Sequence, residues 1–269
     1  MNKFDLLNMA DSSEPVALFI FAHQDDEFGV FQKIIDERQK GHRVCCAYLT
    51  DGGFGGVSPK RRNQESLYVL EQLGVKEQDV FFAGQALGIP DGQLHEHLVS
   101  AANWIDEWFT GFSQIISVYV PAWEGGHHDH DALHAITVCI AEAKGILGNV
   151  RQFSLYNGYG CASVLFKVLA PLPMNGAIEE TRTPSKNRLR FLRYCLCYPS
   201  QTITWLGLFP FVVFHYLVNG KQQLQPVSLE RISCRPHEGA LYYEKRDCFT
   251  WEKMVVCLDE WRNKCSNKN

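Results

Sequence analysis

The order of hydrophobic and polar positions over residues 15–160 predicts strands that alternate with helices. Five runs have the length and apolar character of buried strands, at residues 16–22, 43–50, 80–83, 114–120 and 152–156. Between them, apolar residues recur every three or four positions, which is the period of an amphipathic helix. This alternation is typical of a parallel sheet covered on both sides. We therefore expect an α/β fold with a Rossmann-like, mostly parallel sheet and helices on both faces.

Four helices are expected between these strands. The first covers residues 27–40, and the second begins with Ser58 as N-cap and Pro59 in the first turn and ends at Gly74. The last two are marked by apolar faces, which comprise Leu94, Leu98, Ala101, Ile105 and Phe109 in one and Leu133, Ile136, Ile140, Ala143 and Leu147 in the other.

After about residue 160 the alternation of strands and helices is less regular, because prolines interrupt it. Residues 186–193 are predicted as a basic helix, residues 240–243 as a strand and residues 251–261 as a final helix. We therefore expect a core over about residues 15–160 and a less regular C-terminal extension over about residues 161–269 of one domain that spans residues 1–269.

The longest apolar stretch covers 14 residues, from Trp205 to Val218, and contains Pro210. A membrane-spanning helix needs about 20 residues, so no transmembrane span is predicted. The basic residues Lys186, Arg188, Arg190 and Arg193 precede this stretch, and together they allow a peripheral contact with an anionic membrane surface. Ordinary core packing with a solvated basic face is the favoured interpretation.

The net charge and the cysteines indicate which partners and which cellular location to expect. The net charge is -4 and the pI is about 6.2, which gives no reason to expect nucleic acid as a partner. The ten cysteines are irregularly spaced without a CxxC pair, as expected for reduced thiols. The N-terminus has no basic segment followed by an apolar run, so no secretory signal is predicted and a cytoplasmic location is expected.

Two polar clusters follow directly after predicted strands. The sequence HQDDE occupies residues 23–27, and EGGHHDH occupies residues 124–130. In an open parallel sheet, ligands bind beyond the carboxyl ends of the strands, so both clusters are expected at one edge of the sheet. Their imidazoles and carboxylates are expected to converge there, although about a hundred residues separate them.

These residue types suit a catalytic zinc site, which commonly takes three protein ligands from His, Asp and Glu and leaves one position for water. Three consecutive acidic residues repel one another and resist burial unless a cation lies among them. Each cluster alone is equally explained by carboxylates that cap the following helix. The two clusters together favour a metal centre, with Zn²⁺ as the expected ion and Fe²⁺ as the alternative.

The two clusters resemble the motifs of the LmbE-like (PIG-L) deacetylases, which include the N-acetylglucosaminyl-phosphatidylinositol de-N-acetylases and the mycothiol-pathway deacetylase. The motifs of that family have the form A/P-H-P-D-D-E and G-G-H-P-D-H. The resemblance covers about residues 15–205, and further positions that look like the family's are Thr50-Asp51-Gly52, Arg62-x-x-Glu65, Pro90-Asp91-Gly92 and Tyr198-Pro199-Ser200-Gln201. It implies a zinc-dependent hydrolase with the LmbE-like fold, formed by a single deacetylase domain.

The resemblance also implies roles for individual residues. His23, Asp26 and His130 would be the metal ligands. Asp25 would be the general base that takes a proton from the metal-bound water.

Further roles follow from the same resemblance. His127 would contact the developing oxyanion or protonate the leaving amine. Asp129 and Glu27 would support the ligands, Asp129 by orienting a neighbouring histidine. Arg62 would contact substrate, and Asp91 is expected either to bind a sugar hydroxyl or to form a turn with Gly92.

The sequence departs from the family pattern at Gln24 and His128, where the family usually has proline. Neither position is a ligand or the base in the family, so the catalytic interpretation is kept. His128 adds a possible rival ligand, and so does His134, which lies one helical turn beyond His130.

The leading functional hypothesis is hydrolysis of an N-acetyl group from an amino sugar of the N-acetylglucosamine type or its conjugate. The alternatives are an amidase that acts on a non-sugar N-acyl group and a metal-stabilised binding module without turnover. A nicotinamide-dependent oxidoreductase is disfavoured, because the first strand leads into HQDDE and not into a glycine-rich turn.

Overall fold

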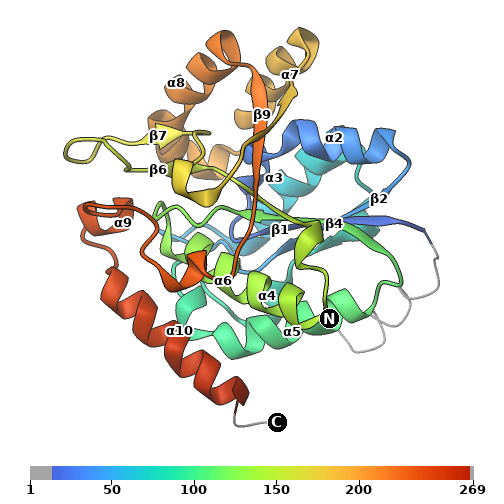
Figure 1. Ribbon diagram of the computed structural model, residues 1–269. Helices are drawn as coiled ribbons and strands as arrows, with labels where there is room; N and C mark the ends of the chain where they lie inside the picture. Colours follow the sequence, from blue (N-terminus) through green and yellow to red (C-terminus); the bar gives the residue numbers. More distant parts are fainter. Residues whose placement is uncertain (1–13, 267–269) are drawn as a thin grey trace.

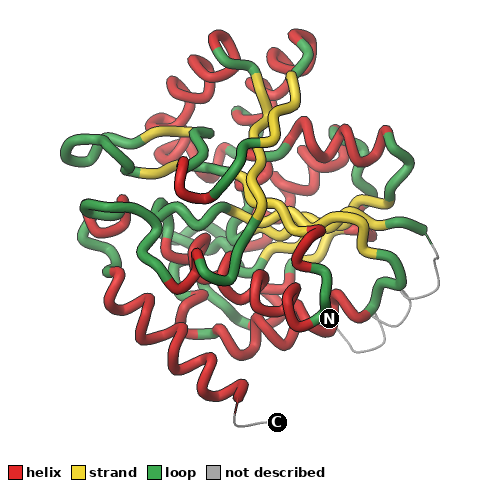
Figure 2. The backbone as a smooth tube through the Cα atoms, viewed as in Figure 1, coloured by secondary structure: helices red, strands yellow, loops and turns green. Residues whose placement is uncertain are grey.

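The computed structural model describes residues 14–266, so the expectation about a secretory signal at the N-terminus lies largely outside the described residues. Its centre is a seven-stranded sheet with the order β3-β2-β1-β4-β5-β9-β8 (Figures 1 and 2). The strands are β1 (Val16–Phe21), β2 (Arg43–Tyr48), β3 (Val80–Phe81), β4 (Ile115–Pro121), β5 (Val150–Phe153), β8 (Glu179–Arg182) and β9 (Lys221–Pro226). β1 to β5 pair in parallel, whereas β9 runs antiparallel to β5 and β8 antiparallel to β9. The predicted α/β fold with a mostly parallel sheet is confirmed.

Helices cover both faces of the sheet (Figure 1). One layer contains α4 (Ala83–Leu87), α5 (Leu98–Thr110), α6 (His128–Ala143) and α10 (Trp251–Ser266). The other contains α2 (Phe31–Gln39), α3 (Pro59–Gln72), α7 (Ser185–Cys195) and α8 (Thr202–Val218). A small hairpin of β6 (Tyr156–Asn157) and β7 (Lys167–Val168) and the short helix α9 (Tyr242–Lys245) lie beside the sheet.

The central strand β1 explains why its sequence is apolar without interruption. Successive side chains of a strand point to opposite faces of the sheet. Leu18 and Ile20 therefore enter one hydrophobic core, and Phe19 and Phe21 enter the other. All four side chains are fully buried.

The chain order across the sheet determines where a site can form. From β1 the chain continues outward to β2 and β3, and it then crosses back to place β4 on the other side of β1. The loops after β1 and β4 consequently leave the sheet in opposite directions and open a crevice at the strands' carboxyl ends. Both predicted polar clusters follow these two strands.

Two predicted helices differ from the observed ones. The helix predicted at residues 27–40 is divided into a 3-10 turn (Asp26–Gly29) and α2. Leu147, placed in the helix after β4, lies in a 3-10 turn beyond the end of α6. α6 stops at Ala143 because Gly145 adopts a positive φ of 69°, a conformation that ends helices.

The strand predicted at residues 240–243 is wrong, because these residues lead into α9. Leu241 and Tyr243 are both buried, which gives the alternation that resembles a strand. The Glu244 carboxylate accepts a hydrogen bond from the Leu241 backbone at 2.7 Å and thereby fixes a helix start.

The helix that contains the apolar stretch Trp205–Val218 is longer than the stretch itself. The helical segment Pro199–Val218 has 20 residues, and by length and composition alone it is sufficient to cross a membrane. Trp205, Leu208 and Val212 are buried against the domain, however, so this helix packs on the protein along one side.

Glu37 is a buried carboxylate at the end of α2. It accepts hydrogen bonds from Lys40 Nζ at 2.9 Å, His42 Nδ1 at 2.6 Å and the Tyr119 hydroxyl at 2.9 Å, and Lys33 Nζ lies 3.1 Å away. Burial by itself would raise the pKa of Glu37, but these donors outweigh it and lower the pKa from 4.5 to about 2.

We expect Glu37 to make the protein acid-sensitive. Its stabilising effect, on the order of 2–3 kcal/mol, is fully present above the unfolded pKa near 4.5 and is lost as the pH falls towards 2. Urea unfolding at several pH values measures the free energy of unfolding. As the pH falls, this free energy should decline less steeply in Glu37→Gln than in the unchanged protein, whereas Glu252→Gln at an exposed position should leave the decline unchanged. Parallel declines for Glu37→Gln and the unchanged protein would contradict this assignment.

Candidate active site

The first part of the site is the turn that follows β1. The Asp26 carboxylate accepts hydrogen bonds through Oδ2 from the backbone N–H groups of Ala22, at 3.0 Å, and His23, at 2.9 Å. The carboxylate is thereby fixed against the end of the strand. Its other oxygen, Oδ1, lies 3.1 Å from His130 Nε2.

His130 comes from the first turn of α6, at the carboxyl end of β4. Its Nε2 atom is 3.2 Å from His23 Nδ1, and the ligand atoms of His23, Asp26 and His130 all lie within 4.8 Å of one another. All three residues are buried. The structure thus brings together the two distant clusters, as the strand order requires.

The spacing of these atoms fits a metal ion. Zinc binds imidazole nitrogen at about 2.0–2.1 Å, which in a tetrahedral site separates two nitrogens by about 3.3 Å. The observed separations of 3.1 and 3.2 Å are close to that value. Oxygen and imidazole nitrogen donors of this kind suit zinc and iron.

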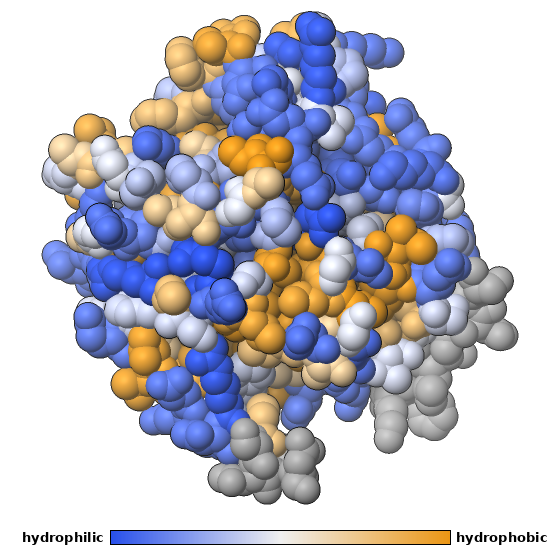
Figure 3. Space-filling model, in the orientation of Figure 1, coloured by the Kyte–Doolittle hydropathy of each residue, from blue (hydrophilic) through white to orange (hydrophobic). Residues whose placement is uncertain are grey.

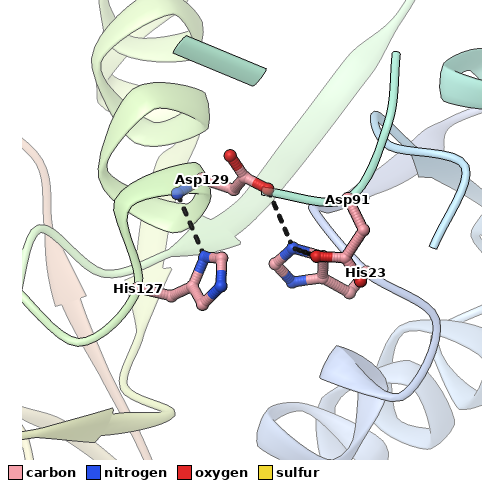
Figure 4. A group of neighbouring side chains, drawn as sticks. All are labelled: His23, Asp91, His127 and Asp129. Atoms are coloured by element: carbon pink, nitrogen blue, oxygen red, sulfur yellow. Dashed lines mark hydrogen bonds and ion pairs between the residues drawn. The ribbon is translucent and has the colours of Figure 1, made fainter. Parts of the chain in front are cut away.

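The opposite side of the His23 ring faces carboxylates. Figure 4 shows that His23 Nε2 points to Asp129 and Asp91, with distances of 3.1 Å to Asp129 Oδ2 and 3.3 Å to Asp91 Oδ1. A proton on Nε2 satisfies these acceptors and leaves the lone pair of Nδ1 directed at His130 and Asp26. This carboxylate–histidine arrangement is the one that orients metal-binding histidines.

A second group of possible ligands lies on this Nε2 side and comprises His23, Asp91, His127 and Asp129. Its carboxylates already have donors: Asp129 accepts the backbone N–H groups of Gly92 at 2.7 Å and Leu94 at 3.0 Å, and Asp91 accepts Arg62 at 3.2 Å. Within residues 14–266, by contrast, the polar contacts of Asp26 Oδ1 and His130 Nε2 are all with members of their own group. The group of His23, Asp26 and His130 is therefore the better metal site.

The two rival histidines have other contacts. His128 belongs to a third group with His95 and Asp129, but its Nε2 atom donates to the Gly92 carbonyl at 2.8 Å and its ring stacks on Phe249. His134 donates from Nδ1 to the Pro121 carbonyl at 2.9 Å. Among the described residues it belongs to none of the candidate metal groups.

Asp25 has a backbone conformation that is rare outside glycine, with φ at 121°. Its N–H donates to Glu27 Oε2 at 2.8 Å, and its carboxylate accepts from Arg62 at 3.1 Å. Glu27 is itself held by the Tyr48 hydroxyl. Burial raises the pKa of Asp25 to about 8 against the lowering influence of Arg62.

Arg62 is buried and links two carboxylates of the site, Asp25 and Asp91. Its guanidinium also donates to the backbone carbonyl groups of Gly52, at 3.0 Å, and Gln24. These contacts fix the positions of both acids, and the residue still lines the cavity.

His127 is the N-cap of α6, and its position determines which nitrogen carries the proton. Nδ1 accepts the backbone N–H of Asp129 at 3.1 Å (Figure 4). A backbone amide can only donate, so the neutral ring has its proton on Nε2. Burial, together with the nearby His23, lowers the pKa of His127 well below its usual value and keeps the ring neutral.

A cavity of about 240 Å³ is lined by six of the site residues, namely His23, Asp25, Asp26, Arg62, Asp91 and His127. One wall comes from the loops after β1 and β4. The other comes from segments in which the sequence identified no site residue, apart from the family-like position at Gln201. The additional residues are Phe54, Tyr156, Gln201, Thr204, Leu208, Tyr243 and Arg246. The Tyr156 ring lies 5.7 Å from that of His130, and no sequence pattern marked it.

Residues 18–141 match the PIG-L family, which is described as GlcNAc-PI de-N-acetylase. This segment is a PIG-L domain. It includes both polar clusters, all of β4 and most of β1. No curated protein matches the chain in sequence.

Several solved structures similar to this chain are deacetylases with low sequence identity. A deacetylase of teicoplanin biosynthesis has a TM-score of 0.61 and 18% identity, covering 79% of this chain and 98% of its own. The A40926 pseudoaglycone deacetylase Dbv21 has a TM-score of 0.54 and 19% identity over 83% and 98% of the two chains. The N,N'-diacetylchitobiose deacetylase from Pyrococcus horikoshii has a TM-score of 0.56 and 16% identity over 88% and 92%. At these identities the similarity shows a shared LmbE-like fold.

The two departures from the family motifs have structural consequences in this PIG-L domain. Gln24 donates a hydrogen bond to Asn63 on α3 at 2.7 Å, so the loop after β1 is tied to a helix where the family usually has proline. His128 packs between the rings of His127 and Phe249. Both side chains stabilise the loops without replacing any of the proposed ligands.

Glu124 is a buried carboxylate in the second polar cluster that the sequence left without a role. It accepts the backbone N–H groups of Leu155 at 2.7 Å and Tyr156 at 3.0 Å, and the Asn157 amide at 3.1 Å. It therefore holds the chain that carries Tyr156 against the loop after β4. The adjacent Gly126 allows this approach, because a Cβ there would lie 1.9 Å from the Tyr156 carbonyl oxygen.

We expect Glu124→Ala to destabilise the protein by about 2–4 kcal/mol, because it leaves buried backbone donors without an acceptor. Glu124→Gln keeps an acceptor oxygen and should cost less. Denaturant unfolding measures both, with Glu142→Ala on the exposed side of α6 as the control. A loss below about 1 kcal/mol for Glu124→Ala would show that these contacts are unimportant.

Proposed function

We propose that this protein is a metal-dependent deacetylase that removes the N-acetyl group of an amino sugar of the N-acetylglucosamine type, or of its conjugate. The observation that carries this proposal is the group of His23, Asp26 and His130. His23, Asp26 and the neighbouring Asp25 line one cavity. The PIG-L match and the deacetylase fold support this reaction. A purely structural metal site has no use for the additional carboxylate of Asp25.

His23, Asp26 and His130 are the proposed ligands, with Zn²⁺ as the expected ion. When bound, zinc supplies a Lewis acid and lowers the pKa of a bound water molecule to about 7. A zinc-inhibited form is known for the similar teicoplanin deacetylase Orf2, so the loading of this protein should be compared with Zn²⁺ and Fe²⁺.

Asp25 is the proposed general base. Its backbone is fixed by Glu27 and its carboxylate by Arg62, at 2.8 and 3.1 Å, so the group is held in place before substrate binds. In the reaction, Asp25 takes a proton from the attacking water as the water oxygen bonds to the acetamide carbon. The carbonyl oxygen then carries a negative charge.

His127 is the proposed donor to this oxyanion. Its Nε2–H is available, because Nδ1 is already occupied by the Asp129 backbone. A neutral ring that accepts at Nδ1 has no second proton to give. We therefore propose that Asp25 protonates the departing amine, using the proton that it took from water.

Asp91 and Arg62 are proposed to position the sugar. Both line the cavity, and one Asp91 oxygen is engaged by Arg62 while the other faces His23. Asp91 also precedes Gly92, whose φ of 83° places it in a turn. The two alternatives for Asp91, a turn residue and a hydroxyl acceptor, are thus compatible.

Asp25→Asn should reduce acetate release from N-acetylhexosamine conjugates by at least about a hundredfold, because the amide cannot take the proton. Metal content by mass spectrometry should stay unchanged. Asp106→Asn on the surface of α5 is the control for handling and folding. Retention of most activity by Asp25→Asn would overturn its role as base.

The ligand set is tested by metal content. His23→Ala and His130→Ala should each lose most of the bound metal, because each removes one of three protein ligands. His134→Ala is a matched control, because His134 is as buried as His130 but is hydrogen-bonded to the Pro121 carbonyl. Loss of metal in His134→Ala, together with retention in His130→Ala, would contradict the proposed set.

A further inference from the structure

The outer side of α8 is apolar where a helix on a protein surface normally carries charge. Ile203, Leu206, Phe214 and Leu217 follow one another at three-, eight- and three-residue steps along this side, and they are 89%, 73%, 65% and 70% exposed. Gly207 and Pro210 lie between these residues on the same side of the helix, and both are exposed. No Asp, Glu, Lys or Arg occurs anywhere in Thr202–Val218.

The inner side of α8 is fixed to the domain. Trp205 packs on the ring of Phe28, with 5.2 Å between ring centroids, and Tyr216 packs on Phe191, with 5.9 Å. A helix that crossed a membrane would have to give up these contacts. α8 therefore presents one apolar side while it lies flat on the protein, which is the geometry of a helix at the membrane surface.

The sequence around α8 is strongly cationic. Residues 181–229 contain no Asp or Glu, and their six Lys and Arg residues are Arg182, Lys186, Arg188, Arg190, Arg193 and Lys221. The whole chain has a net charge of -4, so this segment differs in sign from the rest. Lys186 and Arg193 are exposed on α7 and have no carboxylate within 4.0 Å among residues 14–266.

The apolar and the basic surfaces adjoin each other. α7 and α8 pack side by side, and Figure 3 shows hydrophobic residues over α8 next to hydrophilic ones over α7 at the top of the molecule. The β6–β7 loop adds Val164 and Leu165, which are 56% and 60% exposed.

This surface also borders the active-site cavity. Thr204 and Leu208 of α8 line the cavity, and Phe54, 71% exposed, lies at its rim. Phe211 of α8 contacts Phe166 at 5.0 Å between ring centroids, and Phe166 contacts Tyr156 of the site at 6.3 Å.

We propose that the outer side of α8, together with Lys186 and Arg193 of α7, forms a docking surface for a lipid bilayer with anionic headgroups. The apolar side chains enter the interface between headgroups and acyl chains, and the cations face the headgroups. A second copy of this chain fits less well, because a two-fold interface would place two segments with six cations each, and without acidic residues, against one another. Docking would bring the cavity mouth to the membrane surface, and it does not depend on the proposed reaction.

The apolar part of the surface is tested by vesicle flotation with the full chain at low salt. The unchanged protein should float with vesicles of phosphatidylcholine and 30% phosphatidylglycerol, and Leu206→Glu/Phe214→Glu should reduce the bound fraction at least about tenfold. Tyr68→Glu/Val256→Glu is the matched control, because it adds the same charge at two apolar positions of similar exposure, 53% and 54%, on α3 and α10. It should bind as the unchanged protein does.

The contribution of the basic residues is tested with the double variant Lys186→Glu/Arg193→Glu. Its control is Lys76→Glu/Lys264→Glu, which makes the same charge change elsewhere on the protein. The first double variant should lose the preference for anionic over pure phosphatidylcholine vesicles, and the control should keep it. The preference of the unchanged protein should fall as salt is raised from 50 to 500 mM, because salt screens exposed charges.

The proposal is overturned if the unchanged protein does not bind anionic vesicles at low salt, or if Leu206→Glu/Phe214→Glu binds like its control. It is also overturned if light scattering shows a dimer that this variant dissociates while vesicles bind neither form. Acetate release from a water-soluble N-acetylhexosamine glycoside should be the same in the Leu206→Glu/Phe214→Glu variant and the unchanged protein, which shows that the variant is folded. Absence of that activity in the unchanged protein would count against the proposed reaction and leave the vesicle result as it stands.

Discussion

The close approach of Asp26 and His130, 3.1 Å apart, is the contact on which the site depends. The residues are separated by more than a hundred positions, and they meet because β1 and β4 are neighbours in the sheet. The continuous apolar sequence of β1 and its burial between two helical layers hold those strands together. The hydrophobic core thus determines where the polar groups lie, and the polar groups determine the chemistry.

Burial of these carboxylates costs free energy unless donors replace the lost water, and each acid of the site has at least one such donor. Asp26 accepts two backbone amides, Asp129 accepts two others, and Arg62 serves both Asp25 and Asp91. Such charge-assisted hydrogen bonds offset the cost of removing the carboxylates from water. They also orient the groups, so that the free oxygen of Asp26 and the ring nitrogens of two histidines face one point.

The sequence was sufficient to predict the centre of this arrangement. The two polar clusters follow strands that continuous apolar runs identify, and the carboxyl ends of neighbouring parallel strands lie at one edge of the sheet. The choice of His23, Asp26 and His130 within these clusters came from the resemblance to the LmbE-like deacetylases. The second wall of the cavity was not predictable in this way. Tyr156, Tyr243 and Arg246 come from short, irregular segments whose positions depend on contacts far along the chain, such as those of Glu124. The strand predicted at residues 240–243 was wrong for a different reason, because a local cap by Glu244 starts a helix there.

The position of the metal ion tests the central claim most directly. Crystals of the zinc-loaded protein should show one anomalous-scattering peak at the zinc edge, about 2.0–2.2 Å from His23 Nδ1, Asp26 Oδ1 and His130 Nε2. A peak on the other side of the His23 ring, among Asp91, His127 and Asp129, would contradict the account, and so would the absence of any peak near His23.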